Sequence, residues 1–81
     1  MHETYIFKNI LKYLEAEEKE ASKKIAKIYI TLSEFGALTP EHFQEHFRET
    51  FSGTKWEDMD IEITRIPYGP EFNITRIDFA N

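Results

Sequence analysis

Residues 25–35 read IAKIYITLSEF, and this stretch decides the fold. Apolar and polar side chains alternate along it, which predicts a β-strand with one face buried and the other face open. Gly36 ends the run. The side chains expected in the core are those of Ala26, Ile28, Ile30 and Leu32, and those expected on the open face are Lys27, Tyr29, Thr31 and Ser33.

An amphipathic helix is predicted on each side of this strand. From Thr4, the expected N-cap, to about Lys24 the apolar residues recur at helical spacing. The second helix starts within LTPE at 38–41, where Thr39 can cap it and Pro40 takes the first helical position. The inward stripe of this helix is expected to be Phe43, Phe47 and Phe51.

Two more alternating runs follow, at 59–66 and 72–79. The sequence PYGP at 67–70 separates them and is a turn signal, so the two runs predict a C-terminal β-hairpin. The order is helix, strand, helix, strand, strand. It predicts an α+β fold with both helices packed on one face of a mixed three-stranded sheet. A right-handed crossover makes the first two strands parallel if they are neighbours.

The composition fits a single domain over 1–81. Of the 81 residues, 41% are hydrophobic and 31% are charged, which is ordinary for a globular chain. The absence of cysteine excludes disulfides and thiolate zinc sites, and it favours a reducing compartment such as the cytoplasm. A net charge of −5 argues against nucleic acid as a partner, and no apolar run is long enough for a membrane span.

The start of the sequence, Met1-His2-Glu3, has the donors of a metal chelate. A free α-amino group has a pKa of about 7.7–8.0, so it loses its proton at modest cost near neutral pH. Together with the amide and imidazole nitrogens of His2 and one donor from Glu3, it offers four nitrogen and oxygen ligands in a plane. Such a set suits Ni(II) or Cu(II). The alternative is a solvated start without a role, because short motifs often match by chance.

Two other clusters have simpler explanations. The string HFQEH at 42–46 matches the H-x-x-E-H pattern of inverted zinc proteases, but it has no third ligand and no room for a peptide cleft. His42 and His46 are therefore interpreted as boundary histidines, although two histidines at this spacing can also share a metal ion weakly. The glutamates at 15, 17, 18 and 20 are expected to form a solvated helix face. No catalytic constellation is evident, so the sequence predicts a protein that is not an enzyme.

The chain resembles the hydrogenase/urease nickel-incorporation family, the nickel metallochaperones of hydrogenase maturation. Its Met-His-Glu start before an amphipathic helix is similar to the opening of that family, and LTPEHF at 38–43 is similar to its Pro-Glu helix start. The resemblance covers nearly the whole chain. Further similar positions are 28–34, Phe47, Gly53-Thr54 and 61–63.

This resemblance implies that the chain carries Ni(II) to a nickel enzyme precursor, such as that of [NiFe] hydrogenase, together with maturation proteins that include a GTPase. It implies ligands from the amine of Met1, from the amide and imidazole of His2, and from Glu3. Family members also carry a cysteine-rich zinc ribbon before the last strand. Here a turn at 67–71 is expected in its place, and no zinc is expected.

The loss of the ribbon leaves a second hypothesis open. The chain is then a metal-independent protein-interaction module derived from that family. Its docking surface would be the acidic first helix or the sheet face opposite the helices, with Tyr29 as a candidate anchor.

Overall fold

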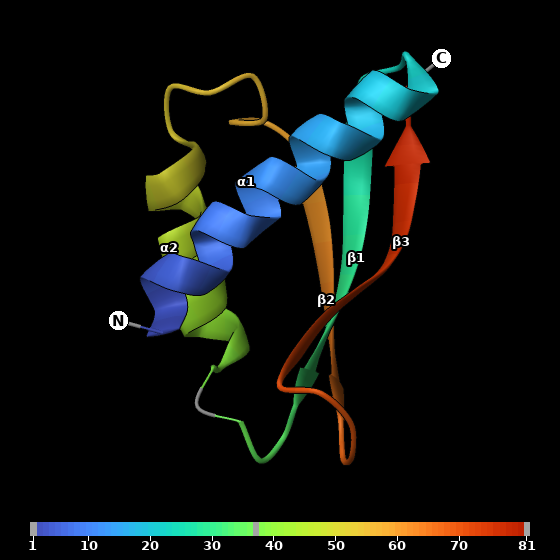
Figure 1. The fold of residues 1–81 in the computed structure, drawn as a ribbon. Coiled ribbons are helices and arrows are strands. Elements are labelled where there is room, and N and C mark those ends of the chain that lie inside the picture. Colours follow the sequence, from blue (N-terminus) through green and yellow to red (C-terminus); the bar gives the residue numbers. More distant parts are fainter. Residues whose placement is uncertain (1, 37, 81) are drawn as a thin grey trace.

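The computed structural model describes residues 2–36 and 38–80. Two helices and three strands follow one another in the predicted order, and both helices lie on the same face of the sheet (Figure 1). The predicted α+β class is therefore confirmed. The elements are α1 (His2–Ala21), β1 (Ile25–Ser33), α2 (Pro40–Phe51), β2 (Asp60–Ile66) and β3 (Phe72–Phe79).

The strand β1 is the centre of the sheet, whose order is β2-β1-β3. It pairs with β2 in parallel, as the helical connection between them predicts, and with β3 in antiparallel orientation. The predicted C-terminal hairpin is wrong, because β2 and β3 lie on opposite edges of the sheet with β1 between them.

Residues 67–71 connect the two edge strands by passing across the end of β1. The backbone N–H of Ser33 donates to the carbonyl of Glu71 at 3.2 Å, and that of Glu34 donates to the carbonyl of Ile66 at 2.8 Å. The turn signal thus marks a chain reversal, but it does not determine which strand lies between the two arms. The apolar strand β1 occupies that place because there both of its edges are paired and its apolar face is covered.

The helix α2 begins and packs as predicted. The Thr39 side chain accepts a hydrogen bond from the N–H of His42 at 3.2 Å, and Pro40 is the first helical residue. The helix α1 begins at His2, two residues before the expected cap, and ends at Ala21. The predicted stripe of α2 is buried, and its members are Phe43, Phe47 and Phe51.

One expectation for the buried face of β1 is wrong. Ala26 is exposed, whereas Ile25 is only 1% exposed. The register between β1 and β3 shifts between Ile25 and Lys27, and such an irregularity interrupts the alternation of faces. The rest of the buried apolar core, apart from the α2 stripe, is Phe7, Ile10, Leu14, Ile28, Ile30, Leu32, Leu38 and Trp56.

One glutamate of the predicted solvated face is buried. Glu18 is 9% exposed, and its carboxylate accepts hydrogen bonds from the N–H of Ile25 and the indole N–H of Trp56, each at 2.8 Å. It also pairs with Lys55 at 2.8 Å. Burial alone raises the pKa of the Glu18 carboxyl, but these donors outweigh burial and hold that pKa below its ordinary value. This carboxylate fixes the second half of α1 against β1 and the segment after α2.

Candidate functional site

The predicted nickel site lies at the start of α1. The backbone is helical from His2 onward, but Met1 and the side chains of His2 and Glu3 lie outside the part of the chain that the structure describes. The first four N–H groups of an α-helix have no partner within the helix. The amide nitrogens of positions 2 and 3 are therefore not needed for the helical ladder. A metal ion that replaces the amide proton of His2 would disturb only the first turn.

The first turns of α1 pack against α2 (Figure 1). The ring of Phe7 lies 5.0 Å from that of Phe43 and 6.0 Å from that of His46, measured between ring centroids. These contacts hold the start of α1 beside the first half of α2. The described start of α1 is thus held by aromatic packing one to two turns further along the helix.

His42 and His46 lie one turn apart on α2, with their ring centroids 6.4 Å from each other. His42 is exposed and His46 is half-buried. Within residues 2–36 and 38–80, no group of three or more histidine, aspartate or glutamate side chains is arranged to hold a metal ion. The described part of the chain therefore gives no support to a three-ligand zinc protease site.

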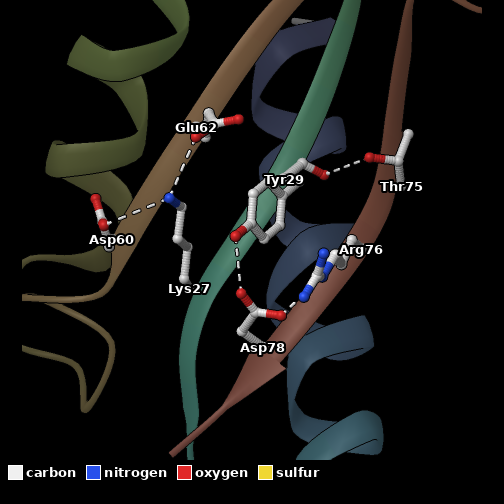
Figure 2. A network of polar contacts seen from close by, with 7 residues as sticks. All are labelled: Lys27, Tyr29, Asp60, Glu62, Thr75, Arg76 and Asp78. Carbon is white, nitrogen blue, oxygen red and sulfur yellow. Dashed lines mark hydrogen bonds and ion pairs between the residues drawn. The ribbon is translucent and has the colours of Figure 1, made fainter.

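The open face of the sheet carries a polar network around Tyr29 (Figure 2). The Tyr29 hydroxyl donates to one carboxylate oxygen of Asp78 at 2.8 Å, and the guanidinium Nε of Arg76 donates to the other oxygen, also at 2.8 Å. On the other side, the Lys27 ammonium lies 3.2 Å from Glu62 and 4.0 Å from Asp60. The network joins all three strands.

Three members of this network, Tyr29, Asp78 and Lys27, have pKa values that are shifted away from neutral pH. The hydrogen bond to Asp78, with burial adding to it, raises the pKa of Tyr29, and the same hydrogen bond lowers the pKa of the Asp78 carboxyl. The hydrogen bond to Glu62 raises the pKa of Lys27. The face therefore presents a neutral phenol between fixed charges. Nothing in these shifts prepares a general acid or base for neutral pH.

Sequence reasoning singled out Tyr29 but missed its partners. Arg76 and Asp78 stand two residues apart on β3, which places them on one face of that strand. This spacing of two residues is visible in the sequence. The hairpin expectation paired β3 with β2, so the neighbour of Tyr29 could not be identified.

A hollow with a volume of about 1110 Å³ lies between the second half of α1 and the segment after α2. It is a shallow, open trough rather than an enclosed pocket. Its charged lining consists of five lysines and two glutamates, namely Lys12, Lys19, Lys23, Lys24, Lys55, Glu15 and Glu18. Glu18 is already held by three donors, so the trough offers no free catalytic carboxylate from the core.

None of the described helices is long and apolar enough to cross a membrane. A comparison with curated proteins found no match. The comparison with protein families found the metallochaperone family HypA, described as hydrogenase/urease nickel incorporation, over residues 1–72 of the 81. The matched region starts with the Met-His-Glu sequence and ends where β3 begins. The chain therefore belongs to the HypA family of nickel-incorporation metallochaperones, whose members act in hydrogenase maturation and are not enzymes.

Proposed function

We propose that this protein carries Ni(II) on Met1, His2 and Glu3 and delivers it during the maturation of a nickel enzyme such as [NiFe] hydrogenase. The observation that carries the proposal is the family match, which includes these three residues. The position of the site supports it, because α1 starts at His2 and leaves the first amides outside the helical ladder.

The donor set suits a carrier. The amine of Met1 and the amide and imidazole of His2 supply three nitrogens, and Glu3 supplies the fourth donor. All of these atoms belong to adjacent residues, so the chelate closes without donors from elsewhere in the fold. Because thiolates are absent, the ion is held by nitrogen and oxygen donors, which also suit Cu(II).

The same proposal includes the partners. These are the hydrogenase maturation proteins, among them a GTPase, and the precursor of the nickel enzyme, in a reducing compartment such as the cytoplasm. The turn at 67–71 takes the place of the zinc ribbon, so 1–81 forms a single nickel-binding domain that needs no zinc. The backbone hydrogen bonds from Ser33 and Glu34 to the two ends of this turn support that assignment.

The test is a titration of Ni(II) into an untagged chain that begins at Met1 with a free amine. Calorimetry should give one tight site, and the absorption spectrum of that complex should be that of planar Ni(II). The His2→Ala variant and a chain with one Gly added before Met1 should both lose this site. Equal affinity in either of them would refute the proposal. Tighter binding of Cu(II) would not, because copper leads the divalent affinity series.

A second candidate function is favoured by the open sheet face around Tyr29, which no described element covers (Figure 2). In this alternative, the chain docks to a maturation partner without handling metal. Binding of a purified maturation GTPase would then persist in chelator and in the His2→Ala variant, but it would weaken in Tyr29→Ala. Binding that requires Ni(II) would exclude this alternative.

A further inference from the structure

All three histidines of the chain belong to one end of the fold. His42 and His46 stand on α2, and His2 is the first residue of α1. Phe7 connects the two helices, since its ring lies 6.0 Å from that of His46. An α-helix rises 1.5 Å per residue, so the helix start at His2 lies about 7.5 Å along the axis from Phe7.

His42 and His46 have the helical spacing at which two histidines can share a metal ion. They are four residues apart on one face of a regular helix, with ring centroids separated by 6.4 Å. The ring of His46 is half-buried beside Phe7, which restricts its motion, whereas His42 is exposed and free to turn toward an ion. The pair is thus partly preorganised.

The surroundings of the pair favour a cation. By helical spacing, Glu45 and Glu49 stand on the same side of α2 as the two histidines, and both are exposed. The inward stripe of phenylalanines lies on the other side of the pair. Carboxylates next to two imidazoles lower the electrostatic cost of bringing in a divalent ion.

We propose that His42 and His46 form a second metal site, which takes a divalent transition metal ion through two imidazole nitrogens. Neutral imidazole is a preferred ligand of Zn(II), Cu(II) and Ni(II). With two protein ligands the ion keeps its remaining positions open to water or to other donors, so the site is weaker than a closed one. The site itself does not depend on the proposed function. A role of this site in binding the nickel that the protein carries does rest on the proposed function.

The experiment isolates the pair by removing the first site. In a chain that carries His2→Ala and one Gly before Met1, the only histidines left are His42 and His46. Ni(II) chloride is titrated into this blocked chain by calorimetry, and NMR line broadening by the paramagnetic ion locates the site. We expect saturable binding of one equivalent, with broadening centred on the first half of α2.

Substitutions in the blocked chain then test the ligands. His42→Gln changes an exposed side chain, so it should leave the fold intact. It should weaken Ni(II) binding by roughly 10- to 100-fold, which is the loss seen when a residue that only hydrogen-bonds to a metal ligand is removed. The double change to glutamine should abolish saturable binding. Glu41→Gln is the matched control, because it removes an exposed charge from the same helix but leaves both imidazoles.

The outcomes separate the two proposals. The second site is refuted if the blocked chain shows no saturable binding, or if His42→Gln binds as tightly as its parent. The nickel-carrier proposal is refuted instead if the native-start chain binds Ni(II) equally well with and without His2.

Discussion

Replacing Glu18 by alanine should cost more stability than any exposed substitution in this domain. Its carboxylate is the common acceptor for the N–H of Ile25 and the indole of Trp56, both at 2.8 Å, and Glu18 itself is 9% exposed. Removing the carboxylate leaves two buried donors without their acceptor. The contact that fixes the second half of α1 against the sheet and the segment after α2 is lost with it.

The magnitude follows from those two donors. A buried donor left unsatisfied costs about 1–3 kcal/mol, so the pair costs about 2–6 kcal/mol. The ion pair with Lys55 adds little, because the Lys55 side chain is 57% exposed and such pairs contribute about 0–1 kcal/mol. A domain of this length has a total stability of about 4–12 kcal/mol. The melting temperature should therefore fall by about 10 °C or more.

The assay is urea unfolding followed by the fluorescence of Trp56, the only tryptophan, with circular dichroism in parallel. Lys55→Met is the matched control, because it removes the ion pair and leaves both hydrogen bonds to Glu18. We expect a loss below about 1 kcal/mol for the control. A cost below about 1 kcal/mol for Glu18→Ala, or an equal loss in both variants, would contradict the stabilising role of the Glu18 carboxylate.

The pKa shifts of Glu18 and Tyr29 and the backbone conformation of Gly69 each have a measurable consequence. The pKa of Glu18 is lower in the folded chain than its ordinary value of 4.5. The stabilisation by its carboxylate should therefore be complete above pH 4.5 and decline as the pH falls below it. In urea unfolding at a series of pH values, a Glu18→Gln chain should lack this loss of stability in acid. The raised pKa of Tyr29 should make its phenol ionise at higher pH than an ordinary tyrosine, and Asp78→Asn should reverse this delay in an ultraviolet titration. Gly69 has φ +125°, and an added Cβ would lie 2.9 Å from the Cδ1 of Ile66. Gly69→Ala should therefore destabilise the protein by about 1–3 kcal/mol in thermal unfolding. Gly53→Ala is the control, because its added Cβ meets no atom within 4 Å and only the strain of its own φ of +80° remains.

The structural features that could be predicted from the sequence are those that depend on residues close to one another in the chain. The Thr39 cap and the phenylalanine stripe of α2 were predictable because each depends on spacing within one helix. The hairpin failed for the opposite reason, since the PYGP turn says nothing about the strand that inserts between its arms. The burial of Glu18 was also missed, because its partners Ile25 and Trp56 lie 7 and 38 residues away.

The same distinction applies to the proposed nickel site, whose donors come from three adjacent residues. A chelate made of an amine, the next amide and an adjacent imidazole is closed by covalent geometry, so it needs no fold to bring its donors together. What the fold must do is leave the first amide nitrogens outside the helical ladder, and a helix that starts at His2 does so. The His42–His46 pair is intermediate, because its spacing is local but its position beside Phe7 is not. Only the structure places it beside the first turns of α1.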